Sequence, residues 1–216
     1  LDTETYKLSP DVSGGSVESM LTTLGGVNSS NELSSQYSVR GGTYDENSVY
    51  INGVEVYRPQ LVTSGQQEGL SVINPDMVGA IGFSTGGFGV EYGDKMSSAL
   101  DITYREPESF EGSVSASLMG GSVAIGQATH KFSQLHGVRY KRNASLLSSM
   151  ESKGEYDPNF FDYQTNLSLR FHPKWKVSFL GNIAINNYKF TRLAGSCHSR
   201  SFYIHQENLL RKLFRF

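Results

Sequence analysis

The chain has 216 residues, 38% of them hydrophobic, a net charge of -2 and a mean hydropathy of -0.35. This length allows one or two domains, and the composition is that of an ordinary folded protein. No run of eighteen apolar residues occurs, which excludes a transmembrane helix, and the first ten residues lack the basic and apolar regions of a signal peptide. The single cysteine, Cys197, excludes an internal disulfide framework and a thiolate metal cluster.

The charges are divided unevenly along the chain. Residues 1–109 contain 15 acidic and 5 basic side chains, whereas residues 110–216 contain 6 acidic and 14 basic ones. Opposite net charges predict that the two parts face each other. The cations of the second part are spread along alternating segments without a nucleic-acid-binding motif, so nucleic acid is not expected as a partner.

Residues 16–24 predict one short amphipathic helix. Ser16 is available as the N-cap, and Gly25-Gly26 is a C-terminal stop signal. The apolar residues recur with helical spacing, at Val17, Met20, Leu21 and Leu24.

Three stretches between residues 36 and 105 carry the strongest local signals. Residues 36–42 are a short β-type run that ends in Arg40-Gly41-Gly42. Residues 48–57 are two such runs joined by Asn52-Gly53, a dipeptide that supplies the two positive-φ residues of a type I′ turn and predicts a β-hairpin. Residues 74–105 place a strand, a glycine-rich reversal and another strand in sequence.

In this order the stretches resemble the plug domain of TonB-dependent outer-membrane receptors. The resemblance rests on Arg40-Gly41-Gly42, Asn52-Gly53-Val54, Gly86-Gly87-Phe88, Glu91-Tyr92-Gly93 and the closing strand 97–102. It implies an α+β plug domain over residues 1–109, in which these motifs are structural. The chain departs from the family at Asn52, where an acidic residue is usual, and at Thr85-Gly86, where many members carry a second arginine.

The same resemblance implies which side chains contact a ligand, because loops at the plug apex do so in this family. The candidates are Tyr44, Tyr57, Arg58 and Gln60. The alternative is that they are ordinary solvated loop side chains. Arg40 is implied to lock the plug by lying buried against barrel glutamates. A segment upstream of the plug couples such receptors to a TonB-type energy-transducing protein, and we expect that segment to lie outside this chain.

One motif points to a different class of protein. Residues 82–86 match G-x-S-x-G, the nucleophile elbow of α/β-hydrolases, with Ser84 as the nucleophile. That elbow needs a helix directly after the serine, and the glycine-rich residues that follow do not favour one. Asp101 and His130 would complete a triad in chain order only. We therefore interpret Ser84 as part of a turn.

From residue 110 the pattern changes to long segments in which apolar and polar residues alternate. The segments cover residues 111–119, 122–132, 137–150, 161–171 and 175–185. Alternation over this length is typical of strands with one apolar and one wet face. The basic residues that fall on the polar face, where an acidic plug would sit, are Arg139, Lys141, Arg170, Lys174 and Lys176.

Strand length favours a membrane barrel over a soluble sandwich. The ten steps of residues 161–171, at about 3.3 Å each and a tilt of about 40°, span roughly 25 Å, the height of an outer-membrane apolar band. Aromatic residues mark both ends, whereas sandwich strands usually have about five or six residues. Residues 110–191 therefore predict five antiparallel strands of a truncated transmembrane β-barrel, with a tight turn at 172–174 and a longer loop at 151–159.

The last stretch, residues 192–216, loses the alternation. It carries a net charge of +4 and contains Cys197, His198 and His205, which in such a tail are weak evidence for a metal site. We interpret it as an irregular tail, read in a shifted frame after a disruption near residue 191. Five strands cannot close a barrel, and an open edge in lipid leaves backbone groups unsatisfied, so we interpret the chain as a fragment.

The sequence thus predicts part of a TonB-dependent receptor in the lipid of a Gram-negative outer membrane. Its expected ligand is a scarce extracellular compound, which is an iron chelate, cobalamin or a glycan. Uptake would be active transport, so we expect no enzymatic activity, no cofactor and no metal. Two other classes stay open: a self-contained β-rich adhesive or structural domain and, with less support, a serine hydrolase using Ser84.

Overall fold

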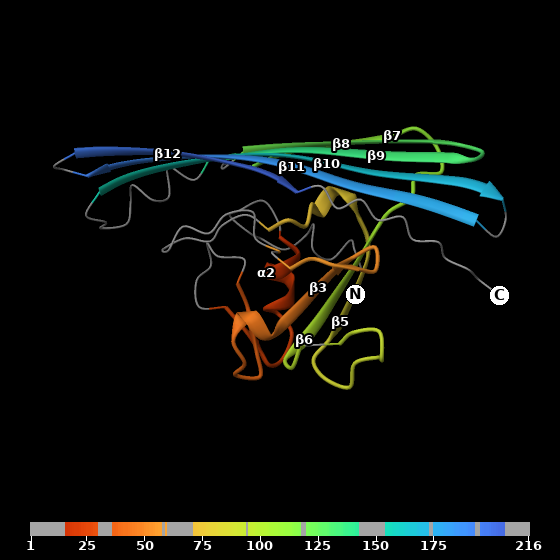
Figure 1. Cartoon of the computed structure of the whole chain (residues 1–216), viewed down its shortest axis with the longest axis horizontal. Coiled ribbons are helices and arrows are strands. Elements are labelled where there is room, and N and C mark those ends of the chain that lie inside the picture. Colours follow the sequence, from red (N-terminus) through yellow and green to blue (C-terminus); the bar gives the residue numbers. More distant parts are fainter. Residues whose placement is uncertain are drawn as a thin grey trace. The chain divides into compact units, whose positions relative to one another are not determined.

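The computed structural model describes residues 16–29, 36–57, 59, 71–93, 95–117, 120–142, 154–172, 175–192 and 195–205. For residues 154–158 and for the described residues between 186 and 205, it describes the backbone and not the side chains. The chain divides into two compact units, Leu1–Arg105 and Glu106–Phe216 (Figure 1). The sequence analysis places the boundary four residues later, at 109/110. Among the described residues, no helix has the length and apolar character needed to cross a membrane.

The first unit is built on a four-stranded sheet in the order β4-β3-β6-β5. Its strands are β3 (Asn47–Ile51), β4 (Val54–Glu55), β5 (Val78–Ser84) and β6 (Ser98–Tyr104). The β3 and β6 strands run parallel, and the other pairs are antiparallel. Two short strands, β1 (Val27–Asn28) and β2 (Ser38–Val39), form a separate pair, and the 3-10 turns η1 (Tyr44–Glu46) and η2 (Pro75–Met77) precede β3 and β5.

The predicted helix is present as α2 (Val17–Leu21), and it ends earlier than the apolar spacing predicts. The Ser16 side chain caps it by accepting from the Ser19 backbone N–H at 3.0 Å. Val17, Met20 and Leu21 are buried. After Leu21 the backbone tightens to i→i+3 bonds, from Thr23 N to Met20 O and from Leu24 N to Leu21 O, which ends the α-helix.

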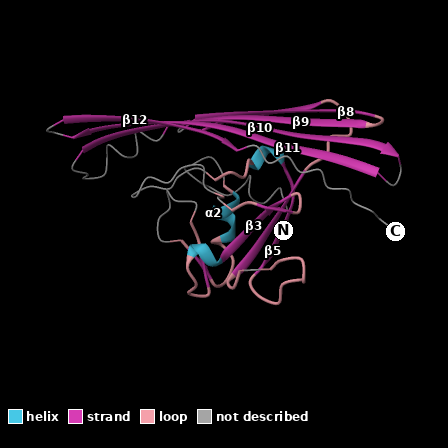
Figure 2. Ribbon diagram, viewed as in Figure 1, coloured by secondary structure: helices cyan, strands magenta, loops and turns pink. Residues whose placement is uncertain are grey.

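The second unit is one antiparallel sheet of six strands in chain order (Figure 2). They are β7 (Glu111–Ser117), β8 (Gly120–Thr129), β9 (Phe132–Arg142), β10 (Gly154–His172), β11 (Trp175–Arg192) and β12 (Gly195–His205). Each of the five strands predicted from alternation overlaps one of β7 to β11. The third, predicted at 137–150, overlaps β9, which begins five residues earlier, and residues 143–150 lie outside the described residues. The tight turn expected at 172–174 coincides with the step from β10 to β11.

The structure differs from the sequence prediction at two places in this sheet. Residues 192–216 were predicted to be irregular, but residues 195–205 of this stretch form β12, which pairs with β11 from Asn182↔His205 to Arg192↔Gly195, while residues 206–216 lie outside the described residues. Residues 154–159 were predicted to lie in a loop, but they continue β10 and pair with residues 187–192 of β11. Strand pairing uses backbone groups, so it extends along an available edge where side-chain alternation is weak.

Candidate functional site

The Arg40-Gly41-Gly42 motif forms a turn at the end of β2. Arg40 and Gly41 have φ angles of 50° and 83°, and the Gly42 N–H donates to the Val39 carbonyl at 2.9 Å. Two consecutive positive φ values with this bond define a type I′ turn. The Arg40 side chain is exposed within this chain, with its guanidinium close to Gly86. Its predicted burial against barrel glutamates stays a prediction.

Gly42 lies against a polar cluster that the sequence analysis missed. The Ser97 hydroxyl donates to Glu46 Oε2 at 2.5 Å, and the Ser97 N–H donates to the Glu46 carbonyl at 3.1 Å. A Cβ at position 42 would collide with both side chains of this pair, so the position needs glycine. The hydrogen bond from Ser97 holds the pKa of the Glu46 carboxyl below its usual range. The cluster joins η1 to the start of β6 across 51 residues.

Asn52 and Gly53 form the predicted type I′ hairpin turn between β3 and β4. Their φ angles are 52° and 75°, and the register Ile51↔Val54 encloses them. Asn52 also has a role that the hairpin signal does not predict. Its Oδ1 accepts from the Tyr104 N–H at 2.8 Å and its N–H donates to the Ile102 carbonyl at 2.7 Å, so it extends the parallel pairing of β3 with β6.

Tyr92, from the predicted Tyr-Gly motif, fixes the glycine-rich segment onto the sheet. Its hydroxyl donates to Asp101 Oδ2 at 2.9 Å, and its ring meets Tyr50 edge-on at a centroid distance of 5.0 Å. The hydrogen bond to Asp101 raises the pKa of Tyr92 to about 12. Gly87 has a φ of 65°, in the left-handed region, while Gly93 has nothing within contact of an added Cβ.

The four candidate ligand-contacting residues fall on two segments that the structure describes to different extents. Tyr44 is half-buried in η1, and its ring meets Tyr37 edge-on at a centroid distance of 6.0 Å. Tyr57, just after β4, is 80% exposed. Arg58 and Gln60 lie outside the described residues, so their placement beside the two tyrosines stays a prediction.

Ser84 lacks the surroundings of a nucleophile elbow. It is the last residue of β5, a bend and turn region follows it, and its hydroxyl donates to the Gly86 carbonyl at 3.1 Å. A nucleophile elbow requires a helix directly after the serine, and residues 85–93 contain none. The turn interpretation of Ser84 agrees with this geometry.

The polar face of the second sheet contains a buried ion pair between β9 and β10. Arg139 and Asp162 are cross-strand partners, and the Arg139 Nε and Nη2 donate to Asp162 Oδ2 at 3.0 and 2.5 Å. Their side chains are only 6% and 0% exposed. Gln164 Nε2 adds a third bond to the same oxygen at 3.1 Å. The alternation predicted the polar face for Arg139, but it did not identify Asp162 as its partner.

The apolar face of the same sheet is its exposed one. The exposed large hydrophobic side chains of β7 to β11 are Val114, Val123, Ile125, Phe132, Tyr140, Phe161, Phe171, Trp175 and Ile183. On β10 the buried positions are instead Phe160, Asp162, Gln164, Asn166 and Ser168. A sheet that buries amides and exposes isoleucine is the reverse of a water-soluble one and matches strands that face lipid.

No group of metal ligands occurs among the residues that the structure describes. The side chains of Cys197, His198 and His205 lie outside the described set, although their backbone belongs to β12.

Comparison with known proteins agrees with the division of the chain. Residues 8–99 match the model of the TonB-dependent receptor plug domain. Among curated proteins, none is similar enough in sequence to count as a relative.

Solved structures are similar over both units. The siderophore receptor PirA from Pseudomonas aeruginosa is 16% identical with a TM-score of 0.60, and the match covers 88% of this chain and 35% of PirA. A point mutant of the ferric enterobactin receptor PfeA from Pseudomonas aeruginosa, in complex with enterobactin, is 15% identical with a TM-score of 0.61 and covers 87% and 33%. This chain spans about a third of the length of these receptors, and at such identity the similarity shows the fold.

Proposed function

Because the plug domain at residues 8–99 and the strands after it make this chain a member of the TonB-dependent receptors, we propose that it is part of a receptor for the active uptake of a scarce iron chelate. Receptors of this family reside in the Gram-negative outer membrane and are transporters, not enzymes. Energy would come from a TonB-type protein of the inner membrane, and the plug would gate the passage of the ligand.

The observation that carries this proposal is the reversed polarity of the second sheet. Val114 is 80% exposed while Asp162 is fully buried, an arrangement that lipid stabilises and water does not. A self-contained adhesive domain working in water would expose the opposite face of its strands. The first unit supplies the gate, since its sheet, hairpin and glycine turns are those of a plug.

The choice of an iron chelate over cobalamin or a glycan rests on the receptors that are similar in fold and on the candidate side chains. The receptors that are similar in fold are named for a siderophore and for ferric enterobactin. Tyr44 and the exposed Tyr57 could stack on an aromatic chelate or hydrogen-bond to its oxygens. Arg58 would add a positive charge toward a chelate that is anionic.

Uptake by cells that carry the full-length receptor tests this proposal. We expect radiolabelled ferric enterobactin or another ferric siderophore to accumulate only when the receptor and a TonB-type protein are both present. Tyr57→Ala should weaken binding of that siderophore by roughly tenfold, in the range of a lost stacking contact of about 1.4 kcal/mol. Val90→Ala, at another exposed position of the first unit, is the matched control.

Two results would contradict the proposal at different levels. Accumulation of labelled cobalamin or an oligosaccharide, but of no siderophore, would overturn the ligand class and keep the transport function. A full-length product that is absent from the outer-membrane fraction and migrates identically with and without heating would overturn the receptor itself.

A further inference from the structure

The boundary between the two compact units is a single peptide bond with an anchor on each side. On the side of the first unit, the Arg105 N–H donates to the Met77 carbonyl at 2.9 Å. A Cβ at position 79 would lie 2.9 Å from the Arg105 Cα, so Gly79 allows the backbone to pass close by. The backbone is therefore held to the first unit up to Arg105, the last residue of that unit.

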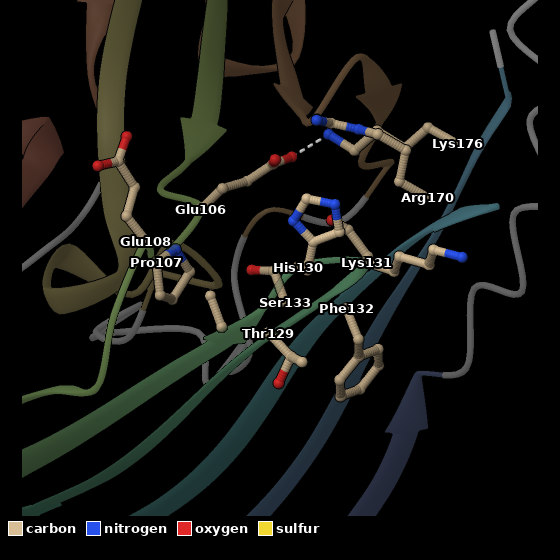
Figure 3. Close-up of a pocket in the computed structure, with 12 residues that line it drawn as sticks. Glu106, Pro107, Glu108, Thr129, His130, Lys131, Phe132, Ser133, Arg170 and Lys176 are labelled. Carbon is tan, nitrogen blue, oxygen red and sulfur yellow. Dashed lines mark hydrogen bonds and ion pairs between the residues drawn. The ribbon is translucent and has the colours of Figure 1, made fainter. Parts of the chain in front are cut away.

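The next two residues are held to the second unit. The Glu106 carboxylate forms an ion pair with Lys176 Nζ at the start of β11, and both side chains are about one-third to two-fifths exposed (Figure 3). Pro107 is buried, and a Cβ at position 126 would lie 2.6 Å from Pro107 Cγ. Gly126 of β8 thus provides the space in which Pro107 is seated. We call Glu106, Pro107, Gly126 and Lys176 the clamp.

The two contacts of the clamp differ in strength. A half-exposed ion pair in reach of water contributes little. The pair lines a polar cavity of ≈ 350 Å³, together with Glu108, His130 and Arg170. The seat of Pro107 is a buried van der Waals contact without spare volume, so a side chain at position 126 would have to displace the proline and also shift the side chain of Glu111, which lies 3.0 Å from the same point. The packing contact is therefore the main anchor, and the ion pair fixes its direction.

The clamp precedes β7, which is an edge strand of the described sheet and pairs only with β8. A pull on the chain at residue 106 would otherwise act on the Glu111 end of β7 and open its backbone hydrogen bonds one after another. With the clamp in place, the same pull acts first on the proline seat and the ion pair. No free length of chain lies between the anchor at Arg105 and the anchor at Glu106.

We propose that the clamp is a strain-relief anchor, which keeps movement of the first unit from peeling β7 off the sheet and confines it to rotation about the backbone φ and ψ bonds on either side of the Arg105–Glu106 peptide bond. The proposal rests on the proposed function only in that the first unit is pulled. The clamp itself can be measured without ligand and without uptake, so its failure and the failure of the transport proposal are distinguishable.

Cleavage by a glutamyl endopeptidase reports on the clamp, because Glu106 and Glu108 lie in the segment between Arg105 and β7, and Glu111 is the first residue of β7. The full-length receptor, folded in outer membranes, is digested, and the rate of cleavage in this segment is measured. We expect Gly126→Val to raise the rate at least tenfold by displacing Pro107. Lys176→Met should raise it about two- to fivefold, since only the weak ion pair is lost, while Lys176→Arg keeps the wild-type rate.

Lys131→Met is the matched control, because Lys131 is a cation at the same end of the sheet that points away from Glu106 (Figure 3). If Gly126→Val fails to fold, judged by the loss of heat-modifiable migration, Pro107→Ala removes the same contact from the other side and should raise the rate by a similar factor. Folded Pro107→Ala and Gly126→Val receptors that are cleaved at the wild-type rate would overturn the proposal.

Discussion

The two units of this chain differ in the balance of apolar and polar side chains that they bury. In the first unit Leu100 and Ile102 of β6 are fully buried, and the sheet packs an apolar core as proteins in water do. In the second unit Asp162 and Gln164 are buried, while Ile125 and Val114 are exposed. We attribute this difference to the surroundings of the exposed side chains, which are water in the first unit and lipid in the second.

Polar contacts have a different structural role in each unit. The first unit uses them to fix turns, as at Asn52 and Glu46, and also inside its sheet, where the Ser98 hydroxyl donates to Asn47 Oδ1 at 2.7 Å. The second unit buries only a few apolar side chains among its described residues, such as Leu135 and Phe160, so its buried face also depends on pairs such as Arg139–Asp162. Buried charges that lose a partner are costly, which makes this pair the point where the contrast can be broken most strongly.

Asp162→Ala should have the largest effect on stability. It leaves the Arg139 guanidinium, 6% exposed, without its carboxylate, which typically costs about 3–5 kcal/mol. The urea midpoint of the full-length receptor, followed by heat-modifiable migration, measures this loss. Ser168→Ala, on the same face of β10 but outside the ion pair, is the control. Equal midpoints for Asp162→Ala and this control would show that the pair does not support the sheet.

Ile125→Lys tests the solvent of the outer face directly. Ile125 is 47% exposed on the apolar face of β8. In a lipid bilayer a lysine there should cost about 2–4 kcal/mol if it lies near the midplane, whereas in water the change would be close to neutral. Refolding equilibria in lipid vesicles measure the cost, with Ile125→Leu as the control. An unchanged equilibrium would mean that this face does not meet lipid.

Asn52→Ala should have an intermediate effect, confined to the first unit. The change places alanine at a φ of 52° and removes the acceptor of the Tyr104 N–H, for a combined cost of roughly 2 kcal/mol. Asn52→Asp keeps both the turn chemistry and an acceptor and should be nearly neutral. Protease susceptibility of the first unit as a function of urea separates the two variants. If both are equally susceptible, the side-chain acceptor is irrelevant.

Tyr92→Phe should have the smallest effect, about 1 kcal/mol for one lost hydrogen bond to Asp101. Its pH dependence is specific. The pKa of Tyr92 is raised from about 10 to about 12 in the folded protein, so the contribution is complete below pH 10 and is lost as the pH rises toward 12. Unfolding midpoints of wild type and Tyr92→Phe should therefore differ at pH 8 and converge at pH 12. A difference that is constant with pH would contradict this assignment.

The features that the sequence predicted correctly are those whose cause is local. The Asn52-Gly53 turn follows from two residues that tolerate positive φ, and β7 to β11 follow from alternation within each strand. The polar face was also predictable, since strand parity assigns Arg139 and Asp162 to one side. The family resemblance supplied the plug motifs as a set.

The features that the sequence did not predict depend on register or on long-range pairing. The Arg139–Asp162 pair requires the turn between β8 and β9 to lie just before Phe132, and the alternation alone had placed the third strand five residues later. Glu46 and Ser97 are 51 residues apart and have no joint signal in the sequence. The sequence of β12 shows no clear alternation, and only its backbone pairing with β11 identifies it as a strand.

The parallel pairing of β3 with β6 also has a kinetic consequence. The first partners, Asn47 and Ser98, are 51 residues apart in the sequence, and bringing them together costs chain entropy before their contact is gained. Hairpins such as β10–β11 close over a few residues and can form early. The central pair of the first unit is completed only by residues that directly precede the clamp. We therefore expect this unit to acquire its native sheet slowly, and only after the chain has been delivered as far as Tyr104.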